Sequence, residues 1–312
     1  WAYVKVGGIG GASVTACQGT LTSLANFTKT KDFDRVWEAY RVGQDLGLDV
    51  SGASAVMAFA MDLYRAGILA GSDIDALHPA YGDGRAVVEM MRKIAMREGV
   101  GDLLADGVKR AAQRLGKPAE ERAVYGKGGL ELWLMEIRPF KAVALTCAVT
   151  DSGSHNRATY GLCEFYYRSM RKQAEAVAKN LVGTEGAAVP TTYELKPELA
   201  IKYEDLHTVA DALGVCSIPF MAVGLDLWAE AYAASTGIEM TPRALVAVAQ
   251  RIRTLERLFN LRQGMTREDD TVAERMFTEP LTEGPWKGEV LDKAKFEQMK
   301  DTYYSLRGWD RD

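Results

Sequence analysis

The chain has 312 residues, of which 47% are hydrophobic and 26% are charged, the balance of a soluble globular protein. This length suits one large domain or two ordinary ones. Its 38 basic and 42 acidic residues give a formal net charge of −4. A nucleic-acid-binding protein usually has a basic excess, so we expect no nucleic-acid partner. No apolar run approaches the ~18 residues of a transmembrane helix, so we expect no membrane span.

Cysteine usage points to a reducing compartment. The four cysteines stand far apart, at Cys17, Cys147, Cys163 and Cys216, without a close Cys-x-x-Cys pair. A chain of this size does not need disulfides to hold its core, so we predict a cytoplasmic protein. The first residue is Trp1 and no signal-peptide layout follows, so a fragment or a processed chain stays an open alternative.

Apolar stripes at helical spacing predict helices in the first half of the chain. They lie within residues 56–63, 87–95 and 104–115. Each is followed by a glycine suited to a helix end, namely Gly67, Gly99 and Gly116. Asp102 stands where the N-cap of the third helix is expected.

The second half is also predicted to be helical. One stripe runs over residues 170–181 before Gly183, and the clearest helix begins at Thr241 with Pro242 as its first residue. Its predicted buried stripe is Leu245, Val248, Ala249, Ile252, Leu255 and Phe259, and its predicted exposed face carries Arg251, Arg253, Glu256 and Arg257. Strand signals are weak, the best being residues 3–6 and 142–149. The pattern predicts a mainly α fold.

Histidine is the side chain best suited to proton transfer near neutral pH. His155 lies in a small polar loop after an apolar run, where either a catalytic or a surface role is open. His78 precedes a proline and is typical of a turn. His207 follows Glu204 and Asp205, and we expect all three on a solvated helix face.

Two hexads resemble each other: Gln-Asp-Leu-Gly-Leu-Asp at residues 44–49 and Asp-Ala-Leu-Gly-Val-Cys at residues 211–216. A glycine turn of this kind lets backbone amides approach a polar ligand, while the last side chain accepts a hydrogen bond or ligates a metal. Chance similarity between two helix ends is the alternative. Cys17 and Cys216 are candidate metal ligands, with ordinary buried thiols as the alternative.

The segments together resemble the tungsten-containing aldehyde ferredoxin oxidoreductase family, over nearly the whole chain. The most specific pieces include Ile-Ala-Met-Arg-Glu-Gly, Leu-Glu-Arg-Leu-Phe-Asn and Tyr-Tyr-Ser-Leu-Arg-Gly-Trp-Asp. The matching positions are residues 47–49, 51–52, 59–60, 67–69, 94–99, 104–107, 127–128, 236–237, 251–252, 255–260, 264, 269–270 and 303–310.

The resemblance implies a mainly α fold of two helical domains, like the C-terminal domains of that family. We expect the first over residues 1–127, shortened near residue 25, and the second over residues 128–312, with the N-terminal β-rich base domain absent. The implied cofactors are a tungsten or molybdenum bis-pterin and a [4Fe-4S] cluster. The implied activity is oxidation of an aldehyde to a carboxylate, with electrons passed through the cluster to ferredoxin or an electron-transfer subunit.

The resemblance also implies roles for individual residues. His155 matches the family's histidine near the metal and would be catalytic. Cys216 matches a cysteine that ligates the cluster beside a pterin. The implied pterin contacts are Gln44, Gly47, Leu48, Asp49, Arg157, Asp211, Gly214, Val215 and Cys216.

Three departures from the family pattern bear on activity. Cys17 fits the first position of a Cys-x2-Cys-x3-Cys ligand pattern, but Thr20 and Leu24 occupy the other two. The family's active-site glutamate has no match in the short connection over residues 25–43, where Glu38 lies outside its motif. The base domain would have to come from elsewhere. The chain is therefore part of a longer polypeptide, one subunit of a split enzyme, or a degenerate relative that serves as a non-catalytic scaffold. A reductase of aromatic thioesters is a further alternative.

Overall fold

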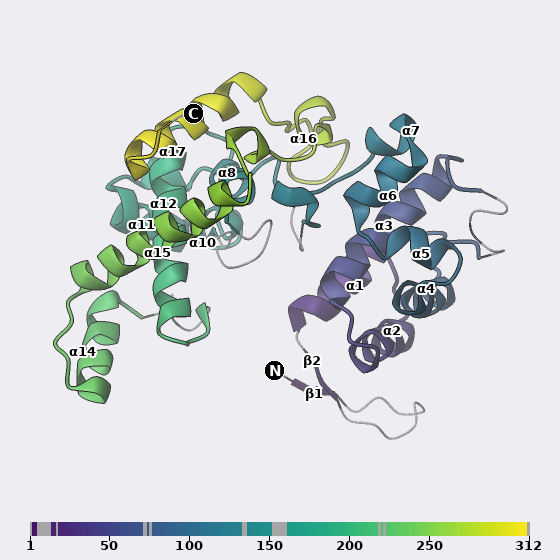
Figure 1. Cartoon of the computed structure of the whole chain (residues 1–312), viewed down its shortest axis with the longest axis horizontal. Coiled ribbons are helices and arrows are strands. Elements are labelled where there is room, and N and C mark those ends of the chain that lie inside the picture. The colour runs from purple at the N-terminus through teal and green to yellow at the C-terminus, as the bar shows by residue number, and fades with distance from the viewer. Residues whose placement is uncertain are drawn as a thin grey trace. The chain divides into compact units, whose positions relative to one another are not determined.

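The computed structural model describes residues 2–4, 14–16, 18–70, 74, 77–132, 136–151, 161–217, 220 and 223–310. These residues are mainly helical (Figure 1). The elements in chain order are β1 (Ala2–Val4), β2 (Val14–Ala16), α1 (Gln18–Thr28), α2 (Phe33–Asp45), α3 (Val50–Arg65), α4 (Gly84–Met96), α5 (Val100–Leu104), α6 (Val108–Leu115), α7 (Lys117–Glu120), η2 (Lys127–Gly129), α8 (Lys141–Val149), α10 (Leu162–Phe165), α11 (Arg171–Val182), η3 (Glu185–Ala188), α12 (Lys196–Ala212), α14 (Leu225–Thr236), α15 (Pro242–Arg262), η4 (Arg267–Asp269), α16 (Arg275–Thr278) and α17 (Lys293–Arg307).

The chain divides into two compact units. Unit 1 contains residues 1–136 with 273–275, and unit 2 contains residues 137–272 with 276–312. The domain boundary that the sequence predicts after Lys127 stays a prediction. Among the described helices, none is both long and apolar enough to cross a membrane.

Unit 1 is built around helices α1 to α6. In it α1 packs on α3 and α2 packs on α4, with the buried side chains forming one continuous core. Gly43 allows the close approach of these helices, because a Cβ at that position would come 2.6 Å from Val50 Cγ2 and 3.2 Å from Met91 Sδ. The strands β1 and β2 pair antiparallel with Ala2 opposite Ala16. A strand was predicted over residues 3–6. The structure describes residues 3 and 4 of it, and both lie in β1.

In unit 2, helix α12 packs against α8, α15 and α17. All nine residues of α8 are buried, and this element was predicted as a strand, which is wrong. A segment buried on every side carries no periodicity, so apolar runs of this length do not distinguish the two states. Glu164 fixes the helical start of α8 by accepting hydrogen bonds from Ala142 N (3.2 Å) and Val143 N (3.1 Å).

The Asp102 prediction is also wrong. Asp102 lies inside α5, whose N-cap is Gly99, and the predicted single helix is two helices, with Gly107 as the N-cap of α6. Gly107 has φ +87°, a conformation that does not occur inside a right-handed α-helix, so one continuous helix cannot pass through this residue. Gly116 ends α6 as predicted.

Helix α15 begins at the predicted cap, with Thr241 Oγ1 accepting from Ala244 N (3.2 Å). Its buried face is only partly the predicted one. Leu245 and Ala249 are buried, but Leu255 and Phe259 are 67% and 63% exposed. Arg253 and Arg257, predicted on the solvent side, are buried instead. The inward face of α15 therefore changes from apolar to cationic along its length.

The buried arginines of α15 meet buried acids. Arg253 Nη2 donates to Glu204 Oε1 of α12 (3.1 Å), and Arg257 Nη1 donates to Asp270 Oδ2 (3.0 Å). Glu204, Asp205 and His207 all lie inside unit 2, so their predicted solvated face is wrong. The charges tolerate burial because they are paired.

Candidate functional site

The hexad at residues 44–49 forms the turn between α2 and α3. Gly47 has φ +73°, Gly47 N donates to Gln44 O (3.2 Å) and Leu48 N donates to Gly43 O (2.8 Å). These are the paired hydrogen bonds of a helix end closed by a left-handed glycine. Asp49 then caps α3, accepting from Ser51 N at 3.0 Å.

The hexad at residues 211–216 forms the same turn at the end of α12. Gly214 has φ +70°, Gly214 N donates to Asp211 O (3.0 Å) and Val215 N donates to Ala210 O (3.0 Å). Cys216 O accepts from Phe220 N (3.2 Å), just as Asp49 O accepts from Ala53 N (2.9 Å) in the other unit. The sequence similarity of the hexads is therefore a similarity of backbone geometry, one turn in each unit.

Both turns present polar groups outward. The exposed members are Gln44, Gly47, Asp49, Asp211, Gly214 and Cys216, and the half-buried members are Leu48 and Val215. Apart from the glycine and its two chain neighbours, no heavy atom of the described residues lies within 4 Å of the Cβ position at Gly47 or Gly214, so a ligand can approach the backbone there. Carboxylate and amide oxygens accept hydrogen bonds, and a pterin ring carries N–H donors, so these residues fit a pterin.

The residues fit a four-thiolate cluster less well. Cys216 is an exposed free cysteine, but Cys147 and Cys163 are buried, and burial raises the pKa of these thiols to about 12 and about 11. Both therefore stay protonated at neutral pH. Leu24 is fully buried in the core of unit 1 and has no donor atom. Thr20 on α1 is half-buried.

Cys17 lies outside the described residues. Within the described part of the chain, no group of three or more His, Cys, Asp or Glu side chains is arranged to hold a metal ion. The described residues thus do not supply a complete ligand set for a [4Fe-4S] cluster.

His155 and Arg157 also lie outside the described residues. Asp151, which precedes that segment, is well held: its carboxylate pairs with Arg253, and its carbonyl accepts from Asn260 Nδ2 (2.9 Å). His78 is exposed, and its Nδ1 is hydrogen-bonded to Tyr64 Oη (3.1 Å).

One acidic residue near the first turn was missed by the sequence analysis. Glu131 lies after η2, and burial and the nearby charge of Asp49 raise its pKa although Val108 N donates to it. Its sequence context, Leu-Glu-Leu-Trp, carries no signal that places it beside residues 44–49. Only the fold brings them together.

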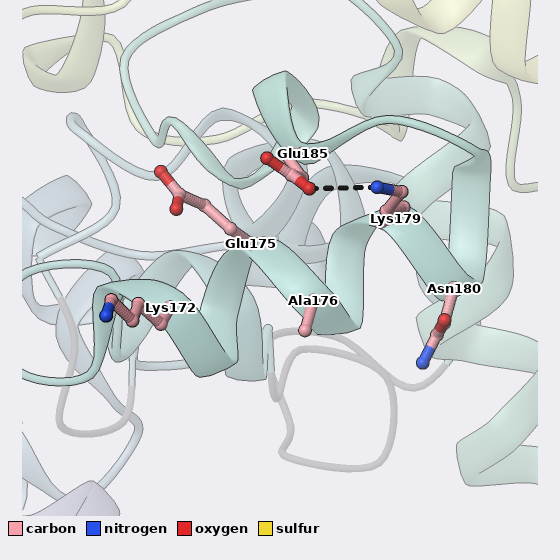
Figure 2. Close-up of a pocket in the computed structure, with 6 residues that line it drawn as sticks. All are labelled: Lys172, Glu175, Ala176, Lys179, Asn180 and Glu185. Carbon is pink, nitrogen blue, oxygen red and sulfur yellow. Dashed lines mark hydrogen bonds and ion pairs between the residues drawn. The ribbon is translucent and has the colours of Figure 1, made fainter.

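A separate depression lies on the surface of unit 2, along α11 and η3 (Figure 2). It is lined by Lys172, Glu175, Ala176, Lys179, Asn180 and Glu185. The ion pair Lys179–Glu185 (3.0 Å) joins its two sides, and both side chains are more than half exposed. None of its residues was predicted as a site residue.

Comparison with known proteins agrees with the fold. A chain in the solved "active site complex BamBC of benzoyl coenzyme A reductase in complex with 1,5 dienoyl-CoA" superposes with a TM-score of 0.74 at 23% identity. The alignment covers 99% of this chain and 48% of that chain. At this identity the likeness shows a shared fold.

Curated relatives are similar over most of this chain. The tungsten-containing aldehyde ferredoxin oxidoreductase of Pyrococcus furiosus is 28% identical over 284 residues, which is 90% of this chain and 44% of that protein. The enzyme of the same name from Thermococcus kodakarensis gives the same values. The "aliphatic sulfonate oxidoreductase, WOR-like subunit" of P. furiosus is 26% identical, covering 88% of this chain and 40% of that protein.

The chain thus spans less than half the length of these curated relatives. The model of one family, described as aldehyde ferredoxin oxidoreductase, domains 2 & 3, matches residues 14–312. The matched residues include most of both helical units and the two like turns. The chain belongs to the aldehyde ferredoxin oxidoreductase family, of which it carries domains 2 and 3.

Proposed function

We propose that the chain supplies the two helical, pterin-contacting domains of an oxidoreductase that converts an aldehyde to a carboxylate. The cofactor would be a tungsten or molybdenum bis-pterin, and the electron acceptor ferredoxin or an electron-transfer subunit. The observation that carries the proposal is the pair of like turns at residues 44–49 and 211–216. The tungsten-containing relatives support the choice of cofactor.

In this proposal the chain binds and orients the cofactor, while the bound metal supplies the two-electron chemistry. Asp49 and Asp211 accept hydrogen bonds from pterin N–H groups, assisted by Gln44. Gly47 and Gly214 leave room for the ring beside the backbone. The backbone of Leu48 and Val215 and the side chains of Arg157 and Cys216 complete the contacts.

His155 is the proposed catalytic residue. Its imidazole would hydrogen-bond the carbonyl oxygen of the aldehyde and carry away the proton that oxidation releases. His155→Ala should then lower turnover severely while the metal content of the protein stays near that of the wild type. Loss of metal together with activity would give His155 a structural role instead.

The first test is elemental analysis of anaerobically purified protein, counting tungsten, molybdenum and iron per chain. About one tungsten or molybdenum supports the proposal, and about four iron atoms in addition mean that ligands beyond Cys216 come from outside the described residues. Metal-free protein that stays folded contradicts the proposal.

The second candidate is a non-catalytic helical scaffold of such a complex. Leu24 and Thr20, in place of cysteines on α1, favour it, because neither side chain supplies a thiolate. A metal-free chain that co-purifies stoichiometrically with a metal-containing partner would establish this role.

A third candidate keeps the redox chemistry and changes the substrate to an aromatic thioester. The likeness to a chain of the benzoyl coenzyme A reductase complex favours it. Parallel assays of metal-loaded protein with aldehydes and with an aromatic coenzyme A thioester distinguish this candidate from the first. The first candidate predicts turnover of aldehydes, and the third predicts turnover of the thioester.

A further inference from the structure

Helix α15 carries an exposed stripe on the face opposite its buried arginines. The members of this stripe are spaced by four, three and four residues and therefore share one face of the helix: Arg251, Leu255, Leu258 and Arg262. Leu255 and Leu258 are 67% and 52% exposed, and Phe259 beside them is 63% exposed. The α15 stripe thus combines an apolar centre with a cation at each end.

Helix α14 carries a second exposed stripe with the same spacing. It lies at the edge of unit 2 (Figure 1), and of its twelve residues, all of them described, only Ala229 is buried. The α14 stripe continues into the turn after the helix and consists of Leu227, Ala231, Ala234 and Ile238. Leu227 and Ile238 are 57% and 56% exposed, so this face is also an apolar surface open to solvent.

The exposed charges beside the two stripes have opposite signs. Helix α14 contains the exposed acids Asp226 and Glu230 and no basic residue, and Glu239 is a further exposed acid in the turn after it. The α15 stripe instead ends in the exposed cations Arg251 and Arg262. Within the described part of the chain, these five side chains have no ion-pair partner, so their charges are available to another molecule.

The charges determine which surface can cover the α15 stripe. Two α15 stripes packed together would oppose arginine to arginine in either direction, and opposed like charges destabilise a contact. The α14 stripe offers apolar side chains at the matching spacing together with acids. In its own copy α14 packs through its other face, around Ala229, so its stripe stays exposed. A second copy of the chain therefore supplies the complementary surface.

We propose that copies of this chain associate in solution through these stripes, with α14 of one copy packed on α15 of another. The four-three-four spacing is that of helices that pack side by side in coiled coils. Each stripe is only roughly 16 Å long, from a rise of about 1.5 Å per residue. The contact is therefore smaller than a standard interface, and we expect a dissociation constant of about micromolar order. This association does not depend on the cofactor or the reaction of the proposed function.

The test is sedimentation velocity of the full chain at about 1 to about 100 µM, a range that brackets micromolar affinity. One variant combines Arg251→Glu with Arg262→Glu, and the other combines Asp226→Lys with Glu230→Lys. Each variant opposes like charges wherever α14 meets α15, so its dissociation constant should rise about tenfold or more. All four positions are exposed, so both variants should stay folded, which far-ultraviolet circular dichroism checks.

An equimolar mixture of the two variants is the most specific measurement. In the mixture the glutamates on α15 of one variant meet the lysines on α14 of the other, so association should return to the wild-type concentration range. Lys172→Glu combined with Lys287→Glu is the matched control, because both lysines are exposed in unit 2 and the net charge changes equally. This control should sediment like the wild type.

Each outcome bears on the proposal. A wild-type chain that stays monomeric at about 100 µM overturns it. Association that either variant leaves undiminished places the contact elsewhere and also overturns it, as does a mixture that associates no better than the separate variants. Weakened association of each folded variant, with recovery in the mixture, supports the pairing of α14 with α15.

Discussion

Replacing Arg253 by Met tests whether the buried ion pairs of unit 2 hold that unit together. Arg253 is 4% exposed and pairs with Asp151 and with Glu204 Oε1 (3.1 Å). Methionine fills much of the same volume and leaves no hydrogen-bond donor. The change therefore removes the cation while disturbing the packing little.

The expected loss of stability depends on which partners each acid retains without Arg253. Glu204 Oε2 still accepts from Arg307 Nη2 (2.7 Å) and from Tyr303 Oη (2.6 Å), so its charge remains balanced. Asp151 loses its cation. Glu256, which is partly exposed, loses a weaker pair with Arg253 (3.4 Å). Removing one partner of a buried pair costs about 3 to 5 kcal/mol, and since Asp151 is the buried acid that loses its cation, we expect a loss of about 3 kcal/mol of unfolding free energy.

The assay is urea unfolding followed by far-ultraviolet circular dichroism, with Arg251→Met as the control. Arg251 lies two residues away on the same helix and is exposed, so its replacement should change stability by less than about 0.5 kcal/mol. Equal midpoints for the two variants, at an unchanged slope, would refute the view that the Arg253 pairs stabilise unit 2.

Three further predictions address other contacts. Lys196→Met should lower the free energy of unfolding by about 3 kcal/mol, because the fully buried Glu164 loses its partner at 2.8 Å. In urea unfolding, adding Glu164→Gln to this variant should recover part of the loss. No recovery would contradict the pairing. Burial opposes ionisation of Asp151, but the charge and hydrogen bond of Arg253, together with hydrogen bonds involving Glu256 and the backbone, lower the pKa of Asp151 overall. The stability that this carboxylate contributes above about pH 4 should therefore be lost as pH falls. Asp151→Asn should flatten that loss in acid unfolding, and an unchanged acid profile would count against it. Gly214→Ala should lower the free energy of unfolding by about 1 to 2 kcal/mol, because φ at this residue is +70°. Gly224→Ala is the control and should lower it less, because φ there is −66°. Equal losses would exclude the left-handed turn at Gly214.

Local signals in the sequence predicted much of the fold. Thr241-Pro242 starts α15, Gly116 and Gly183 end α6 and α11, and the glycines of the two hexads take the left-handed conformation that their turns require. Each of these features depends on a few neighbouring residues, so sequence patterns are sufficient to find them.

Features that depend on residues far apart in the chain could not be predicted from sequence patterns. Helix α15 has apolar residues on two faces, and which face is buried depends on acids from elsewhere in unit 2. Arg253 is buried because it pairs with Glu204, which lies 49 residues away, and Leu255 on another face of the helix is exposed. The position of Glu131 beside Asp49 is likewise a long-range effect. Residue roles at His155, Arg157 and Cys17 stay predictions.

The two turns share a backbone conformation but differ in side-chain chemistry. In unit 1 the sixth residue is Asp49, with Glu131 near it, so the surroundings are acidic and accept hydrogen bonds. In unit 2 the sixth residue is Cys216, an exposed thiol that can ligate a soft metal. The first turn therefore offers hydrogen-bond acceptors, whereas the second offers a thiol. Under the proposed function, similar backbone turns would thus contact a pterin through different side-chain chemistry in each unit, because function depends on the site residues and not on the fold alone.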